Sequence, residues 1–241
     1  ADETAPVLNS FVVDLNDGIL RLTFSEPVTN VKPEAFTFVG DGVPDLILDA
    51  TSGVAQSQNI VVITLLSRDV NLLNQNVGLV DNKDTTFLDA TSNAVSDSYG
   101  VALDLANFPL QATTVIPDTT APTVVSFDLD LSANTITITF DEVVKASTFT
   151  SSSITLQDAT FRTVGLGEAG FVTLDGGAHS DADDTVIVLD LTKTDRDAIK
   201  ARMDMGTSIS NTFLLIDTGL VNDMFSNAVV EVVNGAAVRA S

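Results

Sequence analysis

The stretch Thr135-Ile136-Thr137-Ile138-Thr139-Phe140 alternates polar and apolar side chains with a period of two. This alternation is typical of a β-strand with one buried face, because successive side chains of a strand point to opposite faces. Ile136, Ile138 and Phe140 are therefore expected to face a core, and the three threonines to face solvent. The first half of the chain repeats the pattern in the stretch Ile19-Leu20-Arg21-Leu22-Thr23-Phe24.

Other segments rich in β-branched residues predict further strands, and Gly- and Asp-containing turns separate them. The expected strands are 60–65, 185–191, 212–216 and 229–233. Two short segments, Ser67–Leu73 and Thr194–Lys200, begin with capping-type residues and predict one or two helical turns each. Short strands of this number and spacing predict an all-β fold of two tandem Ig-like antiparallel β-sandwich domains, each with a short helical turn.

Three motifs occur twice and indicate tandem domains. Asp2-Glu3-Thr4-Ala5-Pro6 returns as Asp118-Thr119-Thr120-Ala121-Pro122, and Thr23–Val28 returns as Thr139–Val144, both at an offset of 116 residues. Asp89-Ala90-Thr91-Ser92-Asn93-Ala94-Val95 returns as Asp223–Val229 at an offset of 134 residues. A repeat of this period is typical of whole domains rather than of a solenoid. We expect domain 1 over residues 1–117 and domain 2 over residues 118–241.

The chain is strongly acidic, with a formal charge of −22 over 241 residues. Residues 1–117 hold 15 acidic and 4 basic residues and the rest hold 18 and 7, so each half carries −11. Such a surface repels nucleic-acid phosphates and anionic lipid head groups, and no apolar run approaches the ~20 residues of a membrane span. Cysteine is absent, which excludes a disulfide framework and thiolate chemistry. We therefore expect no nucleic-acid partner and no membrane span in this chain.

Together the repeated motifs resemble tandem bacterial Ig-like domains of the S-layer and adhesin type. In that family the third motif usually reads Asp-x-x-Gly-Asn, so Ser92 and Ser226 stand where glycine is expected and predict a slightly different turn. The resemblance covers both halves. It implies an extracellular, cell-surface structural protein, such as an S-layer subunit, an adhesin stalk or a fibre component, whose partners are other copies of itself or neighbouring surface modules.

Each repeated motif contributes an acid that the sandwich topology is expected to bring to one pole of its domain. The chain enters at that pole, the second strand returns to it, and the loop between the last two strands lies there. Gathered carboxylates repel one another unless they are neutralised, and calcium binds six to eight oxygen ligands in irregular loops. The candidate metal ligands are therefore Asp2, Glu26 and Asp89 in domain 1 and Asp118, Glu142, Asp223 and Asp141 in domain 2.

Asp14 and Asp17, in the turn at the other pole of domain 1, are expected to add ligands at the junction, so that calcium would fix the interdomain angle. The alternative is that all these acids accept hydrogen bonds from backbone amides in turns and bind no metal. The residues leave both interpretations open. No cofactor other than calcium is indicated.

The second copy is longer because of a Gly- and Asp-rich insertion around residues 165–184. Asp175, Asp181 and Asp183 are secondary metal candidates there, although a solvated hairpin tip is the favoured explanation. The insertion also supports an alternative function, a secreted ligand- or carbohydrate-binding or carbohydrate-active module with a pocket lined by Asp175, His179 and Asp181.

Catalysis has little support in the sequence. His179 is the only histidine, and no nucleophile elbow, phosphate loop or histidine-rich metal motif occurs. A sugar-cleaving cleft usually needs aromatic platforms, yet the chain has no Trp and only Tyr99. We expect the protein not to be an enzyme.

Overall fold

A computed structural model describes residues 2–40, 42–162 and 170–241. The chain divides into two compact units, Ala1–Thr119 and Thr120–Ser241. The division falls two residues beyond the boundary expected from the repeat. Both units are built mainly from β-strands, and the all-β prediction is confirmed.

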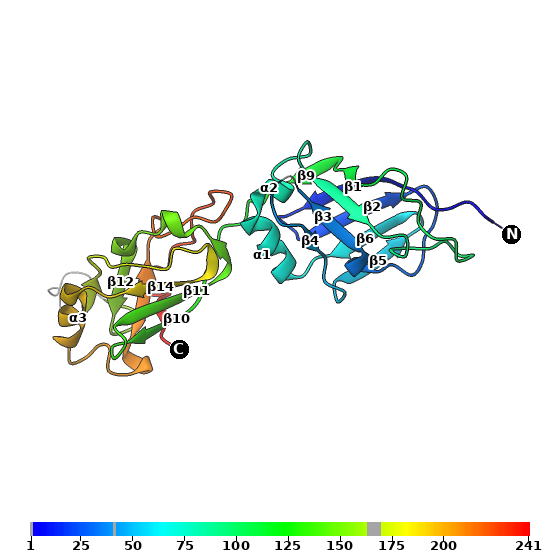
Figure 1. The fold of residues 1–241 in the computed structure, drawn as a ribbon. Coiled ribbons are helices and arrows are strands. Elements are labelled where there is room, and N and C mark those ends of the chain that lie inside the picture. Colours follow the sequence, from blue (N-terminus) through cyan, green and yellow to red (C-terminus); the bar gives the residue numbers. More distant parts are fainter. Residues whose placement is uncertain (1, 41, 163–169) are drawn as a thin grey trace. The chain divides into compact units, whose positions relative to one another are not determined.

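In the first unit the strands form two sheets (Figure 1). One sheet has the order β5-β6-β2-β1-β9 and the other has the order β4-β3-β7-β8. The strands are β1 (Leu8–Asp14), β2 (Ile19–Phe24), β3 (Phe36–Val39), β4 (Leu46–Ile47), β5 (Gly53–Ser57), β6 (Ile60–Thr64), β7 (Phe87–Ala90), β8 (Leu110–Gln111) and β9 (Thr114–Ile116). The sheets are antiparallel except for the β1–β9 pair, which is parallel.

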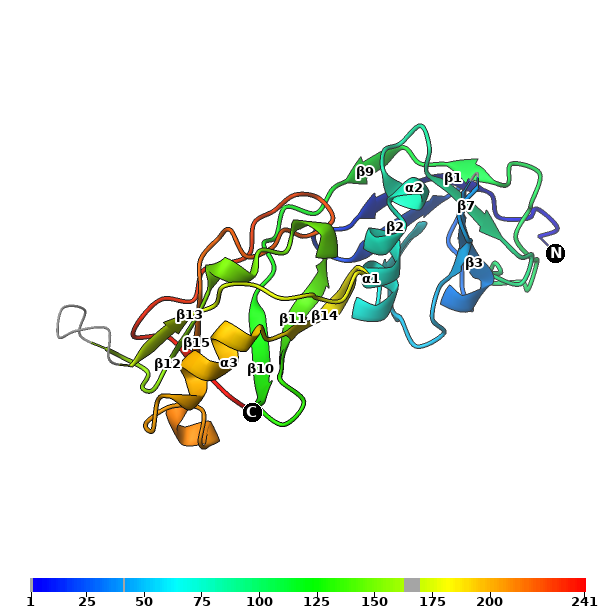
Figure 2. The ribbon, with the colours of Figure 1, turned by 60° about the vertical axis from the view of Figure 1, so that its left-hand side comes forward.

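In the second unit a three-stranded sheet, β10-β11-β14, accompanies a four-stranded sheet, β13-β12-β15-β16 (Figure 2). The strands are β10 (Val124–Asp130), β11 (Thr135–Val144), β12 (Ile154–Gln157), β13 (Phe171–Thr173), β14 (Asp184–Asp190), β15 (Phe213–Ile216) and β16 (Val238–Arg239). All these pairs are antiparallel.

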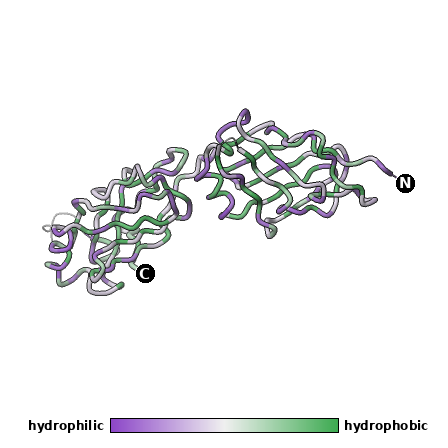
Figure 3. Tube along the Cα trace, viewed as in Figure 1, coloured by the Kyte–Doolittle hydropathy of each residue, from purple (hydrophilic) through white to green (hydrophobic). Residues whose placement is uncertain are grey.

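The core of each unit follows from the period-two pattern of its strands. Ile136, Ile138 and Phe140 on β11 are almost completely buried, as the sequence predicts. They pack in one cluster with residues of the other sheet, such as Ile154 and Leu214. In the first unit the ring of Phe11 on β1 meets the ring of Phe38 on β3 edge to face, with centroids 6.4 Å apart. Hydrophobic residues accordingly run along the strands (Figure 3).

In the described ranges three α-helices accompany the sheets: α1 (Ser67–Gln75), α2 (Val77–Val80) and α3 (Lys193–Lys200). The two expected helices are present, and α2 was not expected. Helix α3 begins earlier than predicted, because Thr192 rather than Thr194 occupies the N-cap. The Thr192 hydroxyl accepts a hydrogen bond from the Asp195 amide (3.1 Å). Leu66 precedes α1 and provides no side-chain cap.

Two short 3-10 turns, Pro33–Ala35 and Ala146–Thr148, follow β2 and β11 at matching places in the repeat. Two more, Ser151–Ser153 and Ile209–Asn211, occur only in the second unit. The strand expected over 229–233 is not formed. Val232 makes only an isolated bridge to Ile216, and the last strand of the unit is β16.

Candidate cation site

Three carboxylates gather in the first unit: those of Asp2, Glu26 and Asp97. One oxygen from each lies within 4.8 Å of the others. Asp2 is exposed in the segment before β1, Glu26 is half-buried just after β2, and Asp97 is buried in the loop that follows residue 96. We call these three residues the carboxylate cluster. They bring together three segments that are far apart in the sequence.

Local backbone geometry positions Asp97. Its Oδ1 accepts hydrogen bonds from the amides of Tyr99 (2.9 Å) and Val101 (2.7 Å), and its own amide donates to the Val101 carbonyl (3.0 Å). Gly100 closes this turn at a φ of +87°, a conformation that favours glycine. The turn therefore fixes the Asp97 side chain through one oxygen only.

The second oxygen of Asp97 has no hydrogen-bond donor among the described residues. Oδ2 is buried, and the whole residue is 2% exposed. Leaving a buried carboxylate oxygen without a partner costs about 1–3 kcal/mol or more, because the group has lost its water. With two further carboxylates beside it, the position suits a cation.

The strand pairing nearby explains how Glu26 arrives at this place. Thr29 pairs with Ser96 across an isolated bridge, with Thr29 N donating to the Ser96 carbonyl at 2.6 Å. This contact holds the segment after β2 against the Asp97 loop. Ser25 Oγ also accepts a hydrogen bond from Val7 N (3.0 Å), which ties the segment after Asp2 to the same place.

Asp89 does not join the cluster, although the sequence placed it there. It lies on β7 opposite Thr37, and its Oδ1 accepts from the Ala90 amide (2.8 Å). The third carboxylate is instead Asp97, eight residues further along the chain. The signal that could have found it is the run Asp97-Ser98-Tyr99-Gly100, which has the glycine that Asp89–Ser92 lacks.

The second unit contains the same turn at Asp223. Its Oδ1 accepts from the amides of Phe225 (2.9 Å) and Asn227 (2.7 Å), as Asp97 Oδ1 does from Tyr99 and Val101. Ser226 adopts a φ of +75° at the place of Gly100. The structural offset of this motif is therefore 126 residues rather than 134.

The remaining candidates in the second unit are placed separately. Asp141 accepts from Thr123 N (2.7 Å) and Thr123 Oγ1 (2.6 Å), a role that Ser25 has for Val7 in the first unit. Asp118 belongs to the first unit, whereas Glu142 and Asp223 belong to the second. The convergence of Asp118, Glu142 and Asp223 stays a prediction.

Asp14 and Asp17 form a turn rather than a cluster. Asp14 Oδ1 accepts from Asp17 N (3.1 Å), and Asp17 Oδ1 accepts from Asn16 Nδ2 (3.2 Å). Within the described ranges, neither residue belongs to a group of three ligating side chains.

The insertion lies partly outside the described residues, which omit 163–169. Asp175 and Asp181 are exposed, and Asp183 Oδ1 accepts from Ala146 N (2.8 Å). His179 packs its ring against Phe149, with centroids 5.0 Å apart. Among the residues that can be placed, no ligating group of three includes Asp175, Asp181 or Asp183.

A separate cleft of about 580 Å³ opens in the first unit between α2 and the sheet that contains β3 and β7. Its walls include Val39, Gly40, Phe87 and Pro109, with Asp84 and Thr85 as its polar members. It shares no residue with the carboxylate cluster.

No protein-family model matches the chain, and no curated protein matches it. Among solved structures, a crystal structure of the S-layer protein rSbsC is 14% identical over 77% of this chain and 23% of that chain, with a TM-score of 0.31. A structure of domains 1–6 of surface layer protein SbsC is 16% identical over 56% of this chain and 18% of that chain, also at 0.31. The N-terminal part of SbsC gives 14% identity, 79% and 45% coverage, and 0.31.

The chain therefore spans less than half the length of each of these three structures. Scores this low do not establish a shared fold. None of the helices in the described part of the chain has the length and apolar composition needed to cross a lipid bilayer.

Proposed function

We propose that this chain is a structural segment of an extracellular cell-surface protein, in which calcium bound by Asp2, Glu26 and Asp97 stiffens the first unit. Two acidic sandwich units in tandem, without cysteine, suit a role in spacing or adhesion at a surface, and the proposal assigns the chain no catalytic activity. The carrying observation is the buried Asp97 Oδ2, which has no hydrogen-bond donor and lies beside two other carboxylates.

Calcium fits this site better than magnesium does. Calcium accepts six to eight oxygen ligands in irregular geometry, whereas magnesium demands a near-ideal octahedron and keeps much of its water. The carboxylate cluster offers oxygens from three irregular segments, and exposed Asp2 leaves room for water ligands on one side.

The mechanical consequence follows from which segments the ion joins. The segment before β1 has no regular structure over residues 2–6, and Asp2, Glu3 and Thr4 are exposed. An ion held by Asp2 would tie this segment to the end of β2 and to the Asp97 loop. Binding to the folded state alone stabilises it by about 2.7 kcal/mol when free calcium is at 100 times its dissociation constant.

Calorimetric titration of the intact chain, with thermal melts in calcium and in chelator, tests this function. We expect one heat-producing site in the first unit and a higher melting temperature in calcium. Asp97→Asn keeps an oxygen for the two amide donors and removes the charge, so this variant should lose the calcium-dependent shift.

Asp89→Asn is the matched control, since Asp89 lies outside the cluster and should leave calcium binding unchanged. The proposal fails if wild type shows neither heat nor a melting shift with calcium, or if Asp97→Asn responds as wild type does.

The second candidate function is a ligand-binding module, and the cleft near α2 is the observation that favours it. Its volume lies in the range of small-molecule sites, and its walls are largely apolar. Binding of an environment-sensitive apolar dye, lost in Phe87→Ala with the fold intact, would support this function. Equal dye fluorescence in both proteins would exclude the cleft as its site.

A further inference from the structure

The two Asp-x-Thr-Ala-Pro segments have different surroundings. In the second copy, Thr119 donates to Asn16 Oδ1 from both its amide (3.1 Å) and its hydroxyl (2.7 Å). Asn74 Nδ2 donates to Asp118 Oδ2 at 3.3 Å. All four residues belong to the first unit. In the first copy, the corresponding Asp2 and Glu3 are exposed.

Asn16 and Asn74 together bind the Asp118–Thr119 segment, because the β1–β2 turn and α1 lie side by side. Asn16 is in the turn between β1 and β2, and Asn74 is in the last turn of α1. Leu65 N, just before α1, donates to the Gly18 carbonyl at 2.8 Å. A Cβ on Gly18 would lie 3.3 Å from Val70 Cγ2, so this turn and α1 are in close contact. In both ribbon views α1 lies at the opposite end of the first unit from the start of the chain (Figure 1, Figure 2).

The second unit has an equivalent surface. Leu191 N donates to the Asn134 carbonyl at 2.8 Å, which repeats the Leu65–Gly18 bond. Buried Asp195 accepts from Asp175 N (2.7 Å), as buried Asp69 accepts from Asp49 N (2.9 Å).

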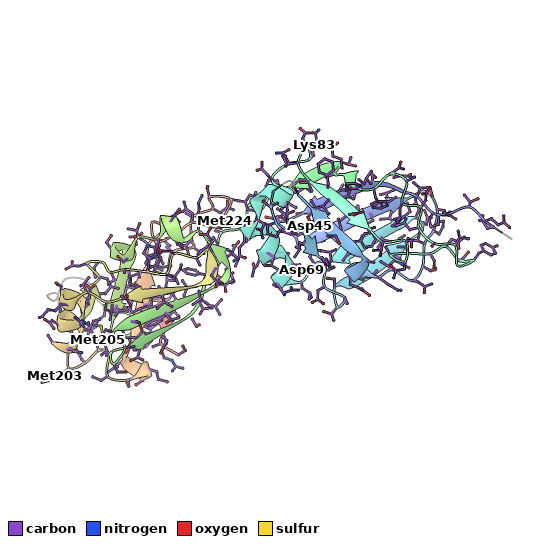
Figure 4. All side chains as sticks on the ribbon, in the orientation of Figure 1. Asp45, Asp69, Lys83, Met203, Met205 and Met224 are labelled. Carbon is purple, nitrogen blue, oxygen red and sulfur yellow. The ribbon has the colours of Figure 1, made fainter. Side chains whose placement is uncertain are left out.

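This correspondence aligns Lys200 with Asn74 and Ser132 with Asn16. Asn74 is buried, whereas Lys200 is exposed. Half-buried Arg202 follows, and Met203 is 96% exposed and projects from this part of the second unit (Figure 4).

We propose that the α3 surface of one copy docks on the exposed Asp2–Glu3 end of a second copy, with Lys200 against Asp2 and Glu3 as Asn74 is against Asp118. Charge favours this pairing. Residues 193–202 at α3 hold four of the 11 basic residues and two acidic ones, Asp195 and Asp197, so the segment is net positive in a chain of net charge −22. Lys193 is paired with Asp197. The docking partner surface presents exposed Asp2 and Glu3, with half-buried Glu26 and buried Asp97 close to Asp2.

The contact is heterologous, because it joins two different surfaces, so repetition gives a closed ring or an open filament according to the rotation between copies. The inference rests on the proposed function, because a structural surface segment works through such contacts. Bound calcium does not remove the attraction: three carboxylates and one divalent ion leave a charge of −1, and Glu3 adds another.

Sedimentation velocity of the full chain over a concentration series tests the docking, in calcium at low and at high salt. We expect the sedimentation coefficient to rise with concentration at low salt and less so at high salt. Lys200→Glu and Glu3→Lys should each lower the association constant at least about tenfold, a loss of about 1.4 kcal/mol. The chain with both changes should regain association, because the charges are exchanged.

Lys83→Glu is the control, since Lys83 is an exposed lysine away from both surfaces (Figure 4). A chain that stays monomeric throughout the series overturns the proposal, and so does a Lys200→Glu variant that associates like wild type. Calcium titration at micromolar protein measures binding at the cation site of the monomer. Glu3 is not part of the carboxylate cluster, so Glu3→Lys changes the docking surface without removing a metal ligand. Failure of docking is therefore distinguishable from failure of the proposed function.

Discussion

The Asp97 loop of the first unit and the Asp223 loop of the second share a backbone hydrogen-bond pattern and differ in the hydrogen bonding of the second carboxylate oxygen. Each aspartate uses Oδ1 to bind the amides two and four residues ahead. In the second unit Asn227 Nδ2 also donates to Asp223 Oδ2 at 2.7 Å. In the first unit the equivalent residue is Val101, which has no polar side chain, and Asp97 Oδ2 stays without a donor. One loop thus supplies its own donor, whereas the other offers the oxygen to a ligand.

The largest effect on this comparison is expected from Asn227→Val, which gives the second loop the side chain of the first. Removing the amide takes a hydrogen bond from the buried Asp223 carboxylate, and such a loss costs about 1–3 kcal/mol. Chemical denaturation should show a lower free energy of unfolding with an unchanged m-value. Asn222→Ala in the same loop region tests whether any polar deletion there has this effect, since no hydrogen bond joins the Asn222 side chain to Asp223 among the described residues.

The reciprocal change, Val101→Asn, should weaken calcium binding. The new amide can donate to Asp97 Oδ2 as Asn227 does to Asp223, so a cation would have to displace this bond. We expect about tenfold weaker affinity, equivalent to about 1.4 kcal/mol. Calorimetric titration measures it, with Val101→Ala as the control that removes the valine without adding a donor. Equal affinities of Val101→Asn and Val101→Ala would contradict the role given to Oδ2.

The same comparison shows what the sequence could and could not predict. The strands at Ile19–Phe24 and Thr135–Phe140 were predictable because their apolar and polar residues alternate, which indicates alternating burial. The convergence of Asp2 and Glu26 followed from sandwich topology. The prediction for the third carboxylate was wrong because both copies contain the sequence Ser-Asn-Ala-Val, at 92–95 and 226–229. Matching these residues aligns Asp89, rather than Asp97, with Asp223.

The turn itself depends on different properties from those letters. It requires an acceptor at its first position and a residue that tolerates positive φ three positions later. Asp97 with Gly100 and Asp223 with Ser226 meet both requirements, whereas Ser92 does not adopt a positive φ. Backbone conformation therefore aligns the copies where side-chain identity does not. The strand predicted over 229–233 was wrong because β-branched composition alone does not specify a pairing partner.

A smaller effect is expected at the positive-φ position of each loop. Ser226 is a non-glycine residue in the left-handed region, which costs about 1–2 kcal/mol relative to a residue without Cβ. Ser226→Gly should raise the free energy of unfolding by about 1 kcal/mol, after its greater flexibility when unfolded is included. Gly100→Ser should lower it by a similar amount. Urea denaturation measures both changes in the free energy of unfolding. Changes of opposite sign would confirm that the two loops are equivalent, and changes of the same sign would contradict it.

The smallest expected effect distinguishes the β10–β11 turn from its counterpart between β1 and β2. Asn16 there becomes Ser132 in the second unit, and the Ser132 hydroxyl donates to Asp130 Oδ1. This bond, with the amides of Ala133 and Ser132, lowers the pKa of Asp130 below its ordinary value of 3.8. The stabilisation is therefore present above about pH 3.8 and is lost as the pH falls through the lower folded-state pKa. Ser132→Ala should raise the Asp130 pKa toward 3.8, which carboxyl NMR titration measures directly. An unchanged pKa would assign the effect to the two backbone amides alone, and the serine would then have no electrostatic role in this turn.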